Sequence, residues 1–273
     1  MRPFVRLSQC FHALGLNVPR VLERDIEQGF FLITDLGDRL YLHHLNASTV
    51  ERLYADAMKA LAVLQSGGGA QDNGLPDYDS ALLHREMELF REWYLLRHLK
   101  RPLDSRQHRV LDEIFARLAD AALGQPRVWV HRDYHSRNLM FTDQNNPGIL
   151  DFQDAVYGPV TYDLVSLLRD CYVAWPRDRV ENWARNYFAQ ARRSGIAVGD
   201  DEQRFIRWFD WMGVQRHLKA TGIFARLCHR DGKPGYLDDV PRTMEYVFQV
   251  SACYPELGPL RSLLTELEVP GLK

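Results

Sequence analysis

Apolar residues recur at helical spacing along most of the chain. Near the N-terminus Phe4, Leu7, Phe11 and Leu14 lie three or four positions apart, and a glycine follows them. This spacing places the four side chains on one face of a helix over 2–14. The same periodicity predicts further helices over 49–64, 79–99, 105–122, 160–174, 178–194, 201–230, 239–253 and 257–267.

Two of these helices have local signals at their ends. The helix over 49–64 is followed by Ser66-Gly67-Gly68-Gly69, a stretch that is predicted to be flexible. The acidic run Asp200-Asp201-Glu202 is interpreted as a helix start, because negative side chains stabilise the positive end of a helix.

A few short apolar runs predict strands instead of helices. Two of them, Val21–Ile26 and Phe30–Thr34, are joined through Gln-Gly and predict one antiparallel pair. A third run, Val128–Val130, reads as a buried strand. The runs Leu139–Phe141 and Ile149–Leu150 flank a polar turn and predict a second hairpin. The predicted fold class is therefore α+β, with a small sheet in front of a large helical part.

The octapeptide at 131–138, His-Arg-Asp-Tyr-His-Ser-Arg-Asn, follows the buried strand and opens the second hairpin. The unit at 128–152 should bring Asp133, Asn138 and Asp151 to one end of the hairpin. In phosphoryl transfer one carboxylate orients and deprotonates the attacking hydroxyl, while an Asn and a second carboxylate offer hard oxygen ligands to Mg²⁺. The pattern H-R-D-x-x-x-x-N followed by D-F is the catalytic pattern of kinases.

A purely structural interpretation of these residues is also available. Buried Asp and Asn side chains often form turns, and a single His is often hydrogen-bonded within the core. Three correctly spaced polar residues between two predicted strands favour the catalytic interpretation. His131 is assigned to architecture, because an imidazole at this point in such a loop hydrogen-bonds the backbone and holds the turn.

The segment after Asp151 narrows the class of kinase. Gln153 stands where a protein kinase has a glycine, and a helix predicted from near Pro159 leaves no room for an activation loop. The short pattern D-F-x-x-A…G-P-x-x-Y-D-L at 151–164 resembles the aminoglycoside phosphotransferase family, kinases of small hydroxylated molecules. The resemblance implies a protein-kinase-like fold, and it implies that Asp163 braces the catalytic loop.

Four strings carry a closer resemblance within that family: 33–39, 131–140, 150–156 and 162–172. They resemble the anomeric sugar kinases of bacterial cell-wall recycling, which phosphorylate the C1 hydroxyl of N-acetylmuramate and N-acetylglucosamine. The resemblance extends from Arg2 almost to the C-terminus. It implies an amino-sugar substrate, ATP as the co-substrate and Mg²⁺ as the metal ion.

A kinase-like fold divides this chain near 35–37, into a remnant of the nucleotide lobe at 1–36 and a helical lobe at 37–273. The hinge of such a fold hydrogen-bonds the adenine edge through backbone groups. An ordinary turn at the end of a strand would have the same sequence, but its position before a helical region favours the hinge. The residues assigned to nucleotide binding are Thr34, Asp35 and Leu36.

The substrate residues are assigned by chemical type. Arginine binds a carboxylate through two parallel hydrogen bonds, so Arg137 and Arg169 are the candidates for the lactyl carboxylate of N-acetylmuramate. His135 is a candidate to hydrogen-bond a sugar hydroxyl, although a role in bracing the loop remains open for it and for Arg137. Trp211 is a candidate to stack on the sugar ring, with core packing as the alternative.

Composition excludes several other functions. The 273 residues carry a net charge of −2, which offers no overall attraction to nucleic acid or to an anionic membrane. The four cysteines lie far apart and suit neither a zinc site nor a disulfide framework. No apolar run approaches the length of a membrane span, and no signal peptide is recognised. A cytoplasmic protein is expected, and its oligomeric state is left open.

The start of the chain departs from the kinase pattern. A complete fold begins with a Gly-rich phosphate loop and a strand Lys that pairs with a helical Glu, but no lysine precedes Lys59 and no acidic residue precedes Glu23. We therefore expect the front of the nucleotide lobe to be missing, which would expose a strand edge and an apolar face. Loss of the phosphate clamp predicts weak or no kinase activity, and a chain extended upstream is expected to be active.

Two rival functions remain open at this point. One is an aminoglycoside or choline-type phosphotransferase with the same machinery, in which several carboxylates or an aromatic cage would line the substrate pocket. The other is a catalytically inactive kinase-fold binding protein. The presence of all three catalytic side chains argues against the second rival.

Overall fold

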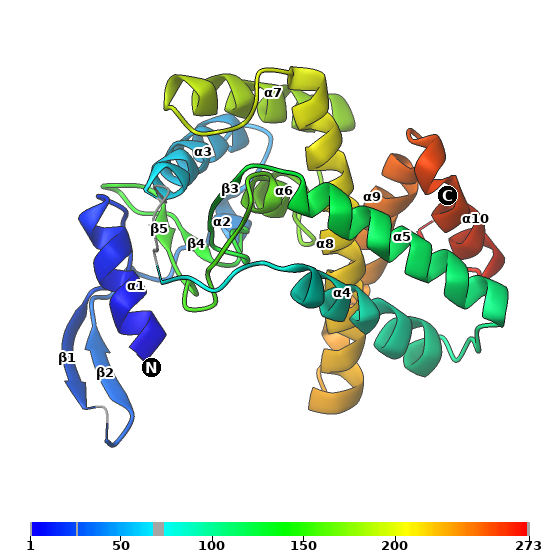
Figure 1. The fold of residues 1–273 in the computed structure, drawn as a ribbon. Helices are drawn as coiled ribbons and strands as arrows, with labels where there is room; N and C mark the ends of the chain where they lie inside the picture. Colours follow the sequence, from blue (N-terminus) through cyan, green and yellow to red (C-terminus); the bar gives the residue numbers. More distant parts are fainter. Residues whose placement is uncertain (1, 26, 68–73, 272–273) are drawn as a thin grey trace. The chain divides into compact units, whose positions relative to one another are not determined.

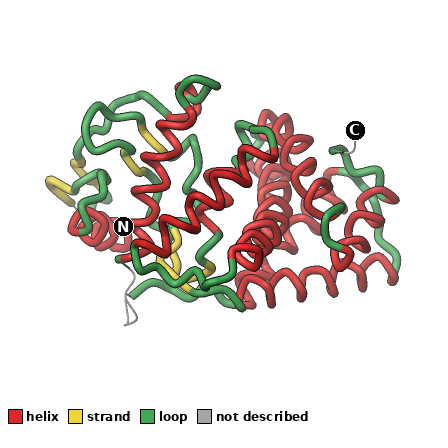
Figure 2. Tube along the Cα trace, turned by 90° about the horizontal axis from the view of Figure 1, so that it is seen from above, coloured by secondary structure: helices red, strands yellow, loops and turns green. Residues whose placement is uncertain are grey.

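The computed structural model describes residues 2–25, 27–67 and 74–271. Its contacts divide the chain into two compact units. The first comprises residues up to 77, 126–168 and 182–200, and the second comprises 78–125, 169–181 and the residues from 201 onward. Every described strand belongs to the first unit, and the regular structure described for the second is helical (Figure 2). The predicted lobe boundary at 35–37 lies inside the first unit and stays a prediction.

Helix α1 (Arg2–Ala13) packs its apolar stripe against the residues around the hairpin unit. Phe11 is fully buried, with its ring centroid 5.8 Å from that of Trp129 and 5.5 Å from that of Phe152. The ring of Phe4 stacks on Phe152 at 5.0 Å. Because Phe152 directly follows Asp151, this aromatic cluster fixes the backbone on which the candidate metal ligand stands. The predicted helix is confirmed, and Gly15 ends it with a φ of 84°.

Strands β1 (Val21–Asp25) and β2 (Phe30–Ile33) form the predicted antiparallel pair (Figure 1). The prediction that β1 reaches Ile26 falls outside the described residues. The pair exposes large apolar side chains: Leu22 is 53% exposed, Phe30 67%, Leu32 58% and Ile33 41%.

Strands β3 (Arg127–Val130) and β6 (Val156–Pro159) pair antiparallel, with Val130 opposite Val156. The segment that joins them contains the second hairpin, β4 (Leu139–Met140) and β5 (Gly148–Ile149). The hairpin was predicted, but β6 was not. Gly158 and Pro159 are uncommon in strands, so the sequence gives no strand signal for β6. The proline is tolerated because it is the last residue of the strand.

Two segments from elsewhere in the first unit close the edges of the second hairpin. Asn17 forms a parallel bridge with Gly148, and the Ile149 N–H donates to the Asn17 carbonyl at 2.7 Å. Leu40 forms an antiparallel bridge with Met140. The hairpin strands have only two residues each, and these flanking bonds give them neighbours on both sides.

Helices α2 (Tyr41–His44), α3 (Val50–Ser66) and α6 (Tyr162–Leu168) complete the core of the first unit, and α7 (Arg177–Arg193) ends in it. Every residue of α6 is buried. The predicted helix over 160–174 is therefore correct in type but too long. Gly68 and Gly69 of the predicted flexible stretch lie outside the described residues.

In the second unit the 30-residue helix α8 (Glu202–Asp231) packs against α4 (Ser80–Leu89), the π-helix η1 (Phe90–His98), α5 (Ser105–Leu123), η2 (Pro234–Asp239) and α9 (Val240–Ser251). Helix α10 (Gly258–Glu266) packs against α5, α9 and η3 (Pro255–Leu257). Asp201 caps α8 through bonds from two backbone N–H groups, which confirms the predicted helix start. Among the described helices, none is long and apolar enough to cross a membrane.

Gly222 lets α8 approach the junction of α4 and η1. A Cβ atom at this position would lie 2.5 Å from the backbone nitrogen of Phe90 and in contact with the Leu89 backbone. Backbone atoms cannot move aside as a flexible side chain can. We expect Gly222→Ala to lower the free energy of unfolding by about 3 kcal/mol, measured by urea denaturation. Gly235→Ala is the control, because nothing lies within 4 Å of its Cβ position. Equal stability of the two variants would contradict the prediction.

Candidate active site

The loop at 131–138 is wound by short-range backbone bonds that begin at Asp133. The His135 N–H donates to the Asp133 carbonyl at 3.1 Å, and the Asn138 N–H donates to the His135 carbonyl at 2.9 Å. The Leu150 N–H then donates to the Asn138 carbonyl at 2.9 Å, which extends the β4–β5 ladder by one pair. Asn138 therefore lies opposite Leu150, the residue that directly precedes Asp151. The three residues predicted to converge are thus tied to one end of a single hairpin.

Asp163 accepts hydrogen bonds from the start of this loop. It is fully buried in the first turn of α6, and its two carboxylate oxygens accept the N–H groups of His131 at 2.6 Å and of Arg132 at 3.0 Å. Arg132 has a φ of 77°, in the left-handed region that a non-glycine residue rarely adopts. The carboxylate therefore holds a strained backbone in place, which is the geometry that a bracing residue requires.

His131 is buried beneath the loop. Its Nδ1 accepts the Asp133 N–H at 3.3 Å, so that ring nitrogen is unprotonated. Burial lowers the pKa of His131 to about 4, although the charges of Asp133 and Asp151 and a hydrogen bond with the Leu150 backbone act in the opposite direction. The imidazole thus contacts the Asp133 backbone, and the architectural role of His131 stays a prediction.

The lowered pKa of His131 has a consequence for stability. An unfolded histidine binds its proton near pH 6.5, whereas folded His131 binds it only near pH 4. Between these values the unfolded state holds more protons, so the free energy of unfolding should fall as the pH is lowered through this window. His131→Asn keeps an acceptor but cannot titrate there. Its pH dependence should be shallower by up to about 1.4 kcal/mol per pH unit in urea denaturation.

Exposed His12 provides the control for this measurement. His12→Asn makes the same substitution at an exposed position, so a shallower pH dependence found only in His131→Asn would be due to the buried ring. If His131→Asn and the wild type lose stability in parallel on acidification, protonation of His131 is not what destabilises the folded state. Buried His217, whose pKa burial lowers to about 3, contributes in the same direction in all three proteins.

Asn138 and Asp151 offer oxygen atoms at the end of the hairpin. The Asn138 Nδ2 donates to the Asp133 carbonyl at 3.0 Å, so the amide oxygen is the atom left to act as a ligand. Asp151 is exposed and has a φ of 62°, a second left-handed residue within the same unit. The side chain of Gln153 donates to one Asp151 oxygen. Two non-glycine residues in this conformation at one site indicate a backbone shaped for function.

These two side chains suit a hard divalent cation. Magnesium prefers oxygen ligands and commonly takes one or two from the protein, with the rest from water and substrate phosphates. Among the residues that the structure describes, no group of three or more His, Cys, Asp or Glu could hold a metal ion. Asn138 and Asp151 would supply two oxygen ligands to such an ion when it is bound.

The predicted hinge follows β2. Thr34 is bonded within the sheet region, because its N–H donates to the Arg20 carbonyl at 3.0 Å and its Oγ1 accepts the Arg20 N–H at 2.9 Å. Asp35 accepts the Gly37 N–H at 2.8 Å and forms a turn, where Gly37 has a φ of 85°. The Thr34 N–H is therefore already bonded to the Arg20 carbonyl. A backbone contact to a nucleotide is proposed below for Asp35 and Leu36.

A cavity of about 430 Å³ lies beside the C-terminal end of β2, the strand that precedes the predicted hinge. Phe4 of α1 and Phe31 and Ile33 of β2 form apolar walls, while Gln153 and Asp154 supply polar groups from the segment after Asp151. A cavity of this size with mainly apolar walls suits a small organic ligand. The sequence patterns did not predict that these residues line a cavity. Only Gln153 had a signal, as the residue that replaces the kinase glycine, because the walls are formed by long-range packing.

The four residues that are predicted to bind the substrate are divided between the two units. His135 and Arg137 are half-buried within the loop between Asp133 and Asn138. Arg169 and Trp211 belong to the second unit. Their roles in substrate binding stay predictions.

Arg169 and Trp211 are both enclosed within the second unit. The Arg169 guanidinium is buried, forms an ion pair with Asp210 and lies 4.6 Å from the ring centroid of Phe209. Trp211 is 6% exposed, and the Arg207 guanidinium lies 4.3 Å from its ring centroid. So little of the Trp211 ring is accessible that core packing, the alternative role, is favoured.

The chain is similar to known phosphotransferases. The model of the phosphotransferase enzyme family matches residues 1–205. An N-acetylmuramate/N-acetylglucosamine kinase of Pseudomonas putida is 49% identical over 98% of this chain and 78% of its own length. The kinase of the same name from Pseudomonas aeruginosa is 47% identical over 97% of this chain and 78% of its own length.

Solved structures agree at the level of the fold. The GDP complex of aminoglycoside 2'-phosphotransferase-IIIa has a TM-score of 0.61 at 14% identity, covering 92% of this chain and 82% of that one. Choline kinase LicA from Streptococcus pneumoniae has a TM-score of 0.60 at 14% identity, covering 91% and 81%. The predicted α+β, protein-kinase-like fold class is thereby confirmed. The chain belongs to the phosphotransferase enzyme family.

Proposed function

We propose that this protein is an ATP-dependent kinase of N-acetylmuramate and N-acetylglucosamine that phosphorylates the anomeric C1 hydroxyl. The names of relatives at 47% and 49% identity support the choice of sugars. A place in peptidoglycan recycling, in the cytoplasm where ATP is present, follows from that substrate. The solved neighbours that act on aminoglycosides or choline are far less similar in sequence and support only the fold.

The observation that supports phosphoryl transfer most is the bonding of the hairpin. Asn138 is tied to Asp133 through its side chain and to Leu150 through its carbonyl, so a candidate base and two candidate metal ligands share one short framework. Phosphoryl transfer depends mostly on positioning and on charge stabilisation rather than on strong bases. A rigid hairpin with an aspartate in its loop is suited to that task.

In the proposed mechanism Asp133 accepts a hydrogen bond from the C1 hydroxyl and takes its proton as the phosphoryl group moves. Asp163 and His131 keep the Asp133 backbone in position through the bonds described above. Asn138 and Asp151 would hold Mg²⁺, which neutralises charge on the β- and γ-phosphates when it is bound. His135 and Arg137 face the substrate from the same loop, and the backbone of Asp35 and Leu36 contacts the nucleotide.

A substrate panel with product analysis tests the proposal. The protein is incubated with Mg-ATP and, separately, each of the two amino sugars, an aminoglycoside and choline, at enzyme concentrations that reveal slow turnover. We expect ADP formation only with the amino sugars. In ³¹P NMR of the product, the phosphorus should couple to the single anomeric proton.

Each other outcome would contradict part of the proposal. Coupling to two methylene protons would place the phosphate on C6 and not on C1. Turnover with the aminoglycoside or with choline, but not with a sugar, would make one of the rival substrates correct. Failure with every acceptor, together with no Mg-ATP binding by calorimetry, would support the inactive binding protein.

A further inference from the structure

A small cavity in the second unit is lined by hydrogen-bond donors. Its volume is about 10 Å³, enough for one oxygen atom, and Arg169, Arg177, Tyr246 and Gln249 lie around it with Trp175 and two valines. None of these lining residues is an Asp or Glu. The mechanism proposed above assigns no role to the Tyr246 hydroxyl or to Arg177.

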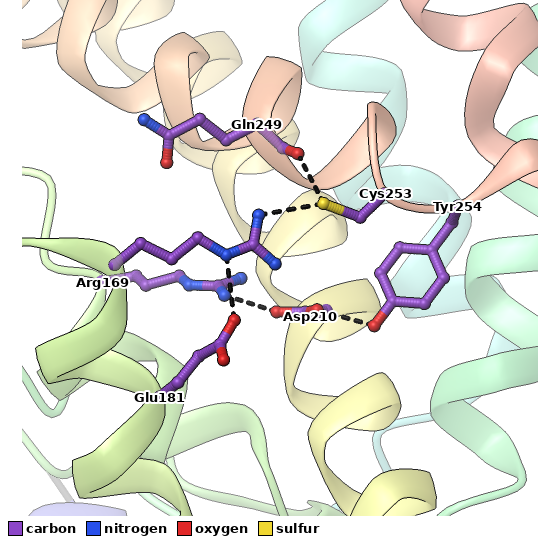
Figure 3. A network of polar contacts seen from close by, with 7 residues as sticks. Arg169, Glu181, Asp210, Gln249, Cys253 and Tyr254 are labelled. Atoms are coloured by element: carbon purple, nitrogen blue, oxygen red, sulfur yellow. Dashed lines mark hydrogen bonds and ion pairs between the residues drawn. The ribbon is translucent and has the colours of Figure 1, made fainter.

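Arg169 is held rigidly at this cavity. Asp210 accepts from one guanidinium nitrogen and also accepts the Tyr254 hydroxyl at 2.6 Å, as the contacts in Figure 3 show. The Arg169 carbonyl accepts from His217 Nε2 at 2.9 Å. The side chain is only 4% exposed, yet its Nη1 has no hydrogen-bond partner within the described part of the chain. A buried guanidinium nitrogen without a partner is costly, which indicates a site for an acceptor.

Tyr246 presents a second donor of the same kind. The residue is 8% exposed, its ring stacks on His217 at 4.9 Å, and its hydroxyl has no partner among the described residues. Arg177 adds a second guanidinium, oriented by a bond to Glu181 at 2.9 Å and by a bond to Cys253 at 2.9 Å. The two carboxylates that neutralise these arginines, Asp210 and Glu181, both lie outside the lining.

The side chains that line the cavity favour one type of ligand. Two guanidinium groups and a tyrosine hydroxyl, with the Arg169 Nη1 and the Tyr246 hydroxyl lacking partners among the described residues, suit an acceptor that carries negative charge. We propose that this cavity takes one carboxylate oxygen of a small organic acid, with the remainder of the acid outside it. The residues around the cavity all belong to the second unit, and the proposed ligand is a small acid that is separate from the sugar substrate.

The test uses Tyr246→Phe, which removes only a hydroxyl that has no protein partner and should not disturb folding. Arg177→Gln is the second variant, and Tyr236→Phe, which does not line the cavity, is the matched control. Lactate and acetate are titrated into each protein by calorimetry at constant ionic strength, with acetamide as the uncharged probe.

Lactate or acetate should bind the wild type and the control about tenfold more tightly than Tyr246→Phe or Arg177→Gln, and acetamide should not bind. Equal binding to the wild type and to both variants, or no binding to the wild type, would overturn the proposal and leave a cavity that holds only water.

Discussion

Asp133→Asn is expected to lower the rate of phosphoryl transfer to N-acetylglucosamine by about 10²–10⁴-fold. The substitution keeps the size and the hydrogen-bonding shape of the side chain but removes its ability to accept a proton as a carboxylate. The substitution keeps the backbone bonds of the loop at this residue, which involve the Asp133 N–H and carbonyl. Single-turnover formation of sugar phosphate measures the effect, since that rate does not depend on product release.

The control for this variant is Asp143→Asn. Asp143 lies in the turn of the same hairpin, is exposed and forms an ion pair with Arg39 at 2.8 Å. It should transfer phosphate at the wild-type rate. Mg-ATP binding by calorimetry should be unchanged in both variants, since Asp133 is assigned to the acceptor and not to the nucleotide. A near-normal rate in Asp133→Asn would show that another group receives the proton.

Asp163→Asn is expected to affect both stability and rate. The buried carboxylate accepts two backbone N–H groups, and hydrogen bonds to a charged acceptor are the stronger kind. An amide offers one oxygen and turns an NH₂ group toward the second N–H. We expect the free energy of unfolding to fall by about 2–4 kcal/mol in urea denaturation. Because the loop would then be less well positioned, the rate should also fall by about 100-fold.

Asp178→Asn is the matched control for Asp163→Asn. Both aspartates lie in the first turn of a helix, but Asp178 is exposed on α7. Its substitution should change stability by less than about 1 kcal/mol, the scale of an exposed helix-dipole contact. The rate must be measured at a temperature where circular dichroism shows the variant to be folded. A folded Asp163→Asn protein with the wild-type rate would show that the loop does not need this brace.

Features specified by nearby residues were predictable from the sequence. The apolar stripe of α1, the β4–β5 hairpin and the start of α8 at Asp201 all depend on contacts within a few positions. The spacing of Asp133, Asn138 and Asp151 on one hairpin is of the same kind, because a short turn fixes which residues lie opposite one another. The role of Asp163 came instead from a family resemblance, since it lies 32 residues from His131.

Features that depend on distant segments needed the tertiary structure. Strand β6 pairs with β3 across the whole catalytic segment, and its Gly158 and Pro159 give no strand signal of their own. Asn17 and Leu40 close the hairpin edges, and α1 with β2 forms the walls of the larger cavity. Local sequence determined the chemistry that the catalytic loop carries. Only packing between residues far apart in the chain decided what holds that loop in place, because such contacts leave no periodicity or spacing in the sequence.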